Sequence, residues 1–205
     1  MKKILLSAII GCSFLGNAFA VQADAEAGKT KAAICGACHG MDGNSLVPAY
    51  PKLAGQHPQY ITKQLQDFKA ALNTGGKEGR NDPIMGGMVA ALTEQDMADI
   101  SAFFTSQTIS ASTAKANPTG KKIYLGGDAD RGITACIACH GNAGEGASLA
   151  GFPAVNSQNV EYLKIQLTKF RDASRNNDMN AMMRTIASKL NDDEIAALAD
   201  YMSSL

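Results

Sequence analysis

The stretch Cys35-Gly36-Ala37-Cys38-His39 recurs about one hundred residues later as Cys136-Ile137-Ala138-Cys139-His140. Both copies follow the pattern Cys-x-x-Cys-His, which is the attachment signal of c-type haem. Two thiols three positions apart can add to the two vinyl groups of one haem, and the adjacent histidine can then reach the iron from one face. In each copy, the pattern predicts that the two cysteines attach a haem covalently and that the histidine is an axial iron ligand.

Three other interpretations of the motif explain less. A dithiol redox motif would sit in a βαβ setting, and strand signals are nearly absent around both copies. A structural zinc site takes four ligands from paired motifs about 15 to 20 residues apart, whereas these two pairs are separated by most of the chain. A disulfide would give no role to a histidine at the same place in both copies.

The first 20 residues have the composition of a secretory signal peptide. Met1-Lys2-Lys3 is positively charged, residues 4–15 are mostly apolar, and Ala18-Phe19-Ala20 is a small-x-small cleavage site. We therefore expect a mature chain that begins near Val21 and resides in the periplasm. The segment ending at Cys12 loosely resembles a lipoprotein processing box, but the apolar run before it is short and a good cleavage site follows.

The remaining composition excludes several classes of protein. Both leader lysines are lost with the signal peptide, so the mature chain carries 17 basic and 19 acidic residues, a formal charge of −2. No basic run suggests nucleic-acid binding, and no later segment is long and apolar enough to cross a membrane. A mature chain of this length allows one domain or two small ones, and a buried haem would complete a small core.

The chain is an internal duplication that extends well beyond the two cysteine motifs. Residues of several types recur at an offset between 96 and 102, as expected when one fold occurs twice. The matched pairs are His39 with His140, Pro51 with Pro153, Tyr60 with Tyr162, Leu65 with Leu167, Phe68 with Phe170, Asp82 with Asp178, Leu92 with Leu190, and Ile100 with Leu198. We therefore predict two tandem domains, residues 21–112 and 113–205, joined by the Ser-, Thr- and Ala-rich segment 106–119.

Each half is predicted to be helical. A first helix (25–34 or 120–125) leads to the cysteine motif, with an inserted loop at 126–134 in the second half, and a Gly-rich loop (40–53 or 141–155) follows the motif. Next comes an amphipathic helix, and Thr93 or Asn191 then caps a last helix with acids in its first turn. The expected core positions are Ile61, Leu65, Phe68, Leu72, Met97, Ile100 and Phe104, and Val160, Leu163, Leu167, Phe170, Ile195, Leu198 and Met202.

The second axial ligand of each iron is expected to be a methionine. The chain has three histidines, and two belong to the haem motifs, so two bis-histidine haems are excluded by counting. We expect the third, His57, to be a surface residue. Met85 and Met183 each lie seven residues before a matched leucine and follow a polar loop, which favours them as ligands. Met88 remains the alternative in the first half, and Met179 and Met182 remain the alternatives in the second.

The two loop prolines suggest how the histidines are held. Pro51 and Pro153 each lie shortly after a ligand histidine. A backbone carbonyl at either place could accept the Nδ1–H of the histidine and fix its ring, as groups behind a ligand commonly do. Proline would also stiffen the loop.

Taken together, these motifs make each half resemble a class I cytochrome c domain, and the tandem arrangement resembles the dihaem cytochrome c4 family. The resemblance covers nearly all of the mature chain and rests on residues 34–40, 50–56 and 63–68 and on residues 150–153 and 166–171. One departure lies in the loop 152–156, which lacks the fuller Pro-Lys-Leu-x-Gly pattern of the first half. The family implies an all-α fold, two covalent haem c groups, and a periplasmic electron carrier.

The same resemblance implies the partners. Family members take electrons from redox proteins of the respiratory chain, deliver them to a membrane-bound terminal oxidase, and are often associated with the membrane. Two alternatives stay open at this point. A dihaem peroxidase-type enzyme would need an open haem face with an acid–base residue beside it, and no spare histidine is placed for that role. A cytochrome subunit held permanently in a larger complex would have the same haem sites.

Overall fold

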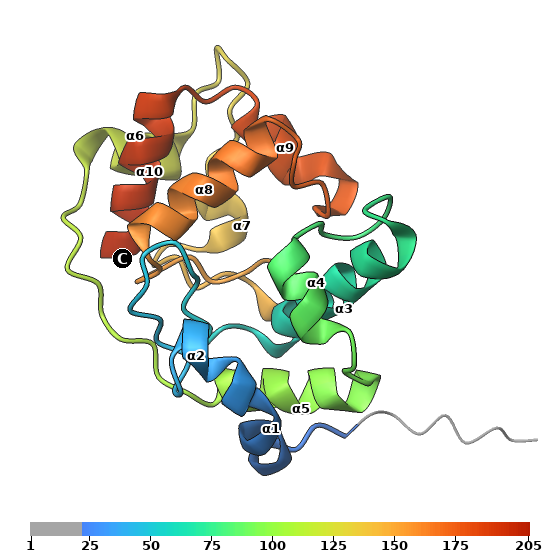
Figure 1. The fold of residues 1–205 in the computed structure, drawn as a ribbon. Coiled ribbons are helices and arrows are strands. Elements are labelled where there is room, and N and C mark those ends of the chain that lie inside the picture. The colour runs from blue at the N-terminus through green and yellow to red at the C-terminus, as the bar shows by residue number, and fades with distance from the viewer. Residues whose placement is uncertain (1–21) are drawn as a thin grey trace, which may run out of the picture.

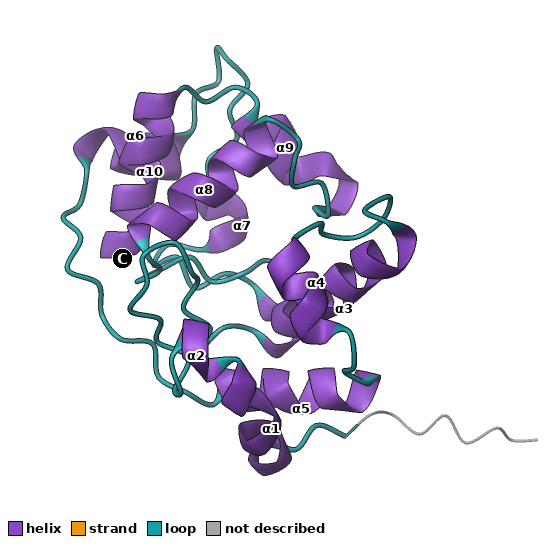
Figure 2. Ribbon diagram, viewed as in Figure 1, coloured by secondary structure: helices purple, strands orange, loops and turns teal. Residues whose placement is uncertain are grey.

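A computed structural model describes residues 22–205, so the predicted signal peptide and Cys12 lie outside the described residues. Helices joined by long loops make up the described chain, and its only β contacts are two isolated bridges, Asp128–Ile133 and Ala147–Phe152 (Figures 1 and 2). The all-α prediction is confirmed. We refer to residues 22–112 as the first half and to residues 113–205 as the second half; the division between them at residue 113 stays a prediction.

Both halves contain the same helices in the same order. The first half consists of α1 (Ala25–Lys31), the 3₁₀ turn η1 (Ala32–Ile34), α2 (Gly36–His39), α3 (Pro58–Thr74), α4 (Pro83–Val89) and α5 (Glu94–Thr105). The second half consists of α6 (Pro118–Gly126), α7 (Ile137–His140), η2 (Ser148–Ala150), α8 (Val160–Arg171), η3 (Met179–Ala181), α9 (Met182–Ala187) and α10 (Asp192–Ser204). The predicted insertion after α6 is a loop closed by the bridge at Asp128.

In each half, the first helix crosses the last helix at a glycine. A Cβ atom placed on Gly28 of α1 would lie 2.0 Å from the carbonyl oxygen of Asp99 in α5. A Cβ atom on Gly120 of α6 would lie 1.9 Å from the carbonyl oxygen of Ala197 in α10. Because only glycine allows backbones to approach this closely, the two crossings have the same geometry and the same sequence requirement.

Each half has its own apolar core, built largely from the predicted residues. Met97, Ile100 and Phe104 of α5 are at most 1% exposed, and the matching stripe of α10 is also buried. The prediction was wrong for Leu72 of α3, which is 49% exposed. It lies beside Gly86 of α4, which has no side chain to cover it, so the buried stripe of α3 ends at Ala71 instead.

The predicted caps of the last helices are present. The Thr93 hydroxyl accepts a hydrogen bond from the Asp96 N–H (3.1 Å), and the Asp96 carboxylate accepts one from the Thr93 N–H (2.8 Å). Asn191 and Glu194 form the equivalent capping box at α10. These reciprocal bonds satisfy N–H groups that have no partner within the helix, so the start of each helix is fixed by local sequence.

The loop that follows the cysteine motif of the first half packs against the start of α8 in the second half. The Tyr162 N–H donates to the Pro48 carbonyl (3.0 Å), and the Asn159 side-chain amide donates to the Tyr50 carbonyl (2.8 Å). The connecting segment runs along the outside of the molecule (Figure 1), and none of residues 106–119 is buried. Among residues 22–205, no helix has the length and apolar character needed to span a membrane.

Candidate haem sites

Each cysteine motif forms a single turn of helix. The His39 N–H donates to the Cys35 carbonyl, and the His140 N–H donates to the Cys136 carbonyl, both at 2.9 Å. Residues three and four apart lie on the same side of a helix, so the turn directs both thiols and the imidazole to one cavity. None of the four cysteines in the described part of the chain forms a disulfide, so all four sulfurs are available for thioether bonds to haem.

A backbone carbonyl holds the histidine ring in each half. His39 Nδ1 lies 2.9 Å from the Pro51 carbonyl oxygen, and His140 Nδ1 lies 2.9 Å from the Pro153 carbonyl oxygen. Since a carbonyl can only accept, each Nδ1 carries the proton and donates it, which leaves Nε2 free to bind a metal. These two contacts confirm the prediction that a backbone carbonyl at each proline accepts the Nδ1–H of the histidine.

Burial keeps both imidazoles neutral. His39 and His140 are 8% and 9% exposed, and burial lowers the pKa of each below the usual value for histidine, against the opposing effect of the proline carbonyl. A neutral imidazole is the form that coordinates iron, so the histidines are prepared for ligation without loss of a proton.

A cavity of about 810 Å³ connects the two motifs and is lined mainly by apolar residues of both halves. Its size lies toward the upper end of the range of roughly 300–1,000 Å³ that is usual for cofactor sites. No group of three or more His, Cys, Asp or Glu side chains that could hold a metal ion occurs within residues 22–205. The donor set fits an iron carried by a large apolar cofactor.

The candidate methionines all line this cavity, but they differ in burial. Met85 packs against the core of the first half and Met183 against the core of the second. Met88 is 36% exposed and Met179 is 48% exposed. This difference supports Met85 and Met183, while Met182 stays an alternative, so the identity of the second ligand in each half stays a prediction.

Two arginines in the cavity wall also fit a haem, and the sequence interpretation did not identify them. Arg80 donates to Gln64 (2.9 Å) and Gln166 (2.8 Å), and Arg175 donates to the same two side chains (3.0 and 2.9 Å). Within residues 22–205, neither guanidinium forms an ion pair with a carboxylate. Arg175 is 6% exposed and Arg80 is partly buried. Buried cations normally have an anionic partner, and the propionates of two haems would supply it.

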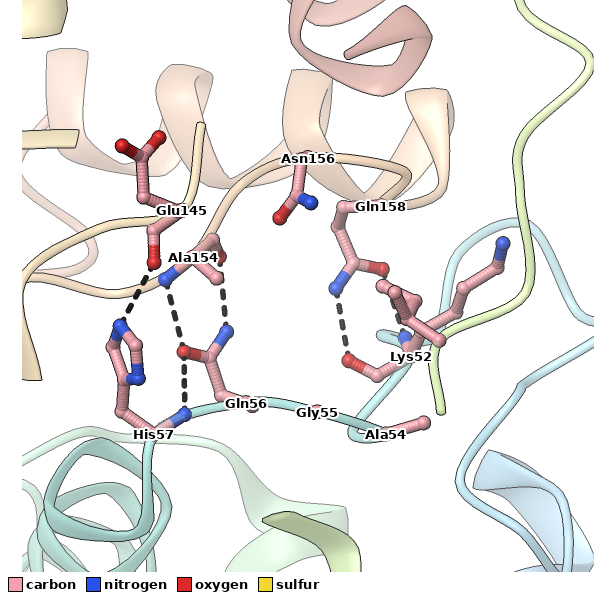
Figure 3. A pocket seen from close by; sticks show the side chains of 10 residues that line it. Lys52, Ala54, Gly55, Gln56, His57, Glu145, Ala154, Asn156 and Gln158 are labelled. Carbon is pink, nitrogen blue, oxygen red and sulfur yellow. Dashed lines mark hydrogen bonds between the residues drawn. The ribbon is translucent and has the colours of Figure 1, made fainter. Parts of the chain in front are cut away.

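His57, which we predicted to be a surface residue, lies at the contact between the halves. It is half-buried, and its Nε2 lies 2.9 Å from the Glu145 carbonyl oxygen of the other half. It lines a separate cavity of about 240 Å³ between the halves (Figure 3). The loop 40–57 meets the other half here, and a contact of this kind gives no signal in the local sequence.

Two histidine-bearing turns and two core-packed methionines line one cavity, and together with the paired cysteines they define a tandem c-type cytochrome. Comparisons with known proteins agree. The Cytochrome c family model matches residues 25–108 and 119–205. Cytochrome c4 of Stutzerimonas stutzeri is 45% identical over the full length of both chains. The crystal structure of reduced cytochrome c4 from Pseudomonas stutzeri superposes with a TM-score of 0.87 at 45% identity, covering 90% of this chain and 100% of that one.

The chain therefore belongs to the dihaem cytochrome c4 family. It is a c-type electron-transfer cytochrome with two covalently bound haem c groups. A more distant relative, the thiosulfate dehydrogenase electron acceptor of Stutzerimonas stutzeri, is 36% identical and aligns with 83% of this chain and 78% of its own length. The resemblance inferred from the motifs is confirmed.

Proposed function

We propose that this chain is a periplasmic electron carrier that accepts single electrons from a respiratory-chain donor and delivers them to a membrane-bound terminal oxidase. Its export rests on the leader sequence at residues 1–20. Association with the membrane is peripheral, because the leader is removed and the carrier must reach an oxidase embedded in the membrane. Haem iron, once bound, supplies the one-electron chemistry.

In this proposal, Cys35 and Cys38 attach the first haem, and Cys136 and Cys139 attach the second. His39 with Met85, and His140 with Met183, provide the axial ligands. The single observation that carries the proposal is the pairing, in both halves, of a carbonyl-fixed histidine with a core-packed methionine. Such a site has no open coordination position for substrate, which favours a carrier over a peroxidase-type enzyme.

The ligands can be tested by optical spectroscopy of the oxidised holoprotein. A weak methionine–iron charge-transfer band in the near-infrared, at the intensity of two haems, is expected. Met85→Ala and Met183→Ala should each remove half of it, whereas the control variants Met88→Ala and Met182→Ala should leave it unchanged. High-spin features from one haem of the unaltered protein would contradict the carrier proposal and favour an enzyme.

A second candidate donor is an enzyme that oxidises a sulfur compound, because one relative is named as the electron acceptor of thiosulfate dehydrogenase. Stopped-flow mixing of the oxidised cytochrome with such an enzyme and its substrate measures reduction, and mixing the reduced cytochrome with oxidase-containing membranes measures delivery. Rapid reoxidation by the membranes supports the proposed acceptor. If reoxidation is no faster than in membranes lacking the oxidase, a terminal oxidase is not the acceptor.

A further inference from the structure

Gln56 and Gln158 lie at the contact between the halves. Each side chain forms two hydrogen bonds to the backbone of one residue in the opposite half. The Gln158 side chain accepts the Lys52 N–H at Oε1 (2.8 Å) and donates from Nε2 to the Lys52 carbonyl (2.9 Å). The Gln56 side chain accepts the Ala154 N–H (3.0 Å) and donates to the Ala154 carbonyl (2.9 Å). Figure 3 shows both pairs side by side.

Each of these N–H groups belongs to the peptide group whose carbonyl holds an axial histidine. The Lys52 N–H and the Pro51 carbonyl are the two ends of one peptide bond, and that carbonyl accepts the proton of His39 Nδ1. The Ala154 N–H and the Pro153 carbonyl are likewise the two ends of the bond that holds His140. A continuous chain of hydrogen bonds therefore runs from each histidine through one peptide group to a glutamine of the other half.

The glutamine ends of these chains are buried, which increases their electrostatic effect. Gln56 and Gln158 are 8% and 5% exposed, and Lys52 is 7% exposed. A peptide whose N–H donates a hydrogen bond has a more polarised carbonyl, and such bonds strengthen one another in a medium of low dielectric. A stronger bond at Nδ1 makes the imidazole a better electron donor to iron and stabilises the oxidised state.

We infer that Gln158 tunes the haem of the first half and that Gln56 tunes the haem of the second, each acting as a positioning residue through the peptide that holds the opposite histidine. The inference rests on the proposed roles of His39 and His140 as ligands. It follows that each haem has its working potential only while the two halves are docked. A glutamine that served the interface alone would affect both haems alike, or neither.

The test uses the full-length dihaem protein with Gln158→Leu, which keeps the side-chain size and removes the acceptor. At a fixed applied potential, the ratio of reduced to oxidised iron in the first half should rise about threefold, the effect of losing part of one hydrogen bond. The second haem should change much less. Gln56→Leu should give the mirror result. A redox titration followed by paramagnetic NMR resolves the two haems and also reports the exchange rate of each histidine Nδ1–H.

Two further variants separate tuning from simple docking. Gln59→Ala removes another bond between the halves, from the Ser148 hydroxyl to Gln59 Oε1 (2.7 Å), which has no link to either proline peptide, so both ratios should stay unchanged. Gln158→Glu keeps an oxygen acceptor for the Lys52 N–H, so the first-half ratio should not rise and exchange at His39 Nδ1 should stay slow. Gln56→Leu, with the roles of the two haems exchanged, provides the test if Gln158→Leu does not accumulate.

Crosswise shifts together with faster exchange at the opposite histidine support the inference. A Gln158→Leu protein in which both haems shift equally, in which only the second-half haem shifts, or in which neither shifts would overturn it. So would a first-half ratio that rises in Gln158→Glu as much as in Gln158→Leu. Failure of the proposed histidine ligation is recognised separately, because the paramagnetic NMR spectrum of the unaltered protein would then lack the strongly shifted ring-proton signals of His39 and His140.

Discussion

The two halves of the molecule share the crossing of the first and last helices but anchor it differently. In the first half, the buried Asp99 carboxylate accepts hydrogen bonds from the Asp24 N–H (2.9 Å), the Lys31 ammonium (2.7 Å) and the Gln95 amide (2.7 Å). The matching position in the second half is Ala197, which accepts nothing through its side chain. There, Tyr124 donates to the Gly141 carbonyl (2.7 Å) and packs edge-on against a second tyrosine.

Near each crossing, the two halves differ in the size of matched core residues, and a smaller residue at one position is accompanied by a larger one at another. The first half combines the small Ala32 with the large Phe104, whereas the matched positions of the second half hold Tyr124 and Met202. The cavity side of the two halves is alike in its histidine, its proline carbonyl and its cross-half glutamine. The comparison teaches that the repeat is retained at the glycine of each helix crossing and where it faces the cavity and the other half, while the remaining core positions need only to be filled.

The largest effects are expected where the two halves are alike, at the helix crossings. Gly28→Ala and Gly120→Ala should each destabilise the protein by about 3 kcal/mol or more, because the new methyl group must force two backbones apart. Gly87→Ala in α4 is the control, since nothing lies within 4 Å of its added Cβ. Guanidinium unfolding of the holoproteins measures all three. A mild effect at only one of the two crossings would show that they are not equivalent.

We expect the contacts of the Asp99 side chain to contribute more to the free energy of unfolding than the hydrogen bond of Tyr124. Asp99→Ala removes three hydrogen bonds and leaves the Asp24 N–H without its acceptor, whereas Lys31 keeps Asp96 and Gln95 keeps the Gln22 carbonyl. The substitution is expected to cost about 1–3 kcal/mol. Tyr124→Phe keeps the packing and removes one hydrogen bond, so it should cost about 1 kcal/mol. The same unfolding measurements compare the two. Equal losses, or a larger loss for Tyr124→Phe, would contradict the assignment of the polar anchor to the first half.

The first-half anchor should also depend on pH. The hydrogen bond from Lys31, then that from the Asp24 N–H, holds the pKa of Asp99 below its usual range. Its stabilising contribution is therefore complete above the pKa of about 3.9 in the unfolded chain and is lost as the pH falls through the lower folded value. The stability difference between the unaltered protein and Asp99→Ala should shrink on acidification below about pH 4. A difference that stays constant would rule out the ionised carboxylate as the anchor.

The smallest expected effect concerns the loops that carry the candidate methionines. In the second half, Asn180 and Ala181 have φ values of 52° and 55°, whereas the first half begins α4 with ordinary helical geometry after the Asp82 cap. Ala181→Gly should raise stability by about 0.5 kcal/mol, because glycine relieves the left-handed strain but adds chain entropy. Ala90→Gly, at φ −51°, should destabilise instead. Thermal unfolding measures both, and the same sign for both would refute the strain argument.

Local signals made much of this structure predictable. The cysteine motifs, the helix caps at Thr93 and Asn191, and the prolines that hold the histidines each depend on residues close together in the chain. Leu72 and His57 were misjudged because their exposure depends on which segment covers them, and periodicity does not report that. The choice between Met182 and Met183 is limited in the same way, because adjacent residues in a loop share the same local signal.

The contacts between the halves were missed for a different reason. Four side chains form hydrogen bonds to partners about 80 to 110 residues away in sequence, namely Gln56, Gln158, Arg80 and Arg175. No short sequence pattern predicts contacts over such a separation. The duplication did contain a usable signal, since Gln56 and Gln158 recur at the same offset of 102 as Tyr60 and Tyr162. In a duplicated chain, polar residues that recur at the same sequence offset as the core residues are therefore candidates for the contact between the two halves.

The reciprocal glutamine contacts also bear on the origin of the chain. Each half presents the same surface to the other, so that residue 56 meets residue 154 and residue 158 meets residue 52, which is the arrangement of a two-fold homodimer. A single-domain ancestor with this surface would have paired with its own copy before gene fusion joined the two. In this arrangement, the linker 106–119 mainly raises the effective concentration of one half near the other. A protease cut within its exposed residues should therefore leave two fragments that remain bound to each other.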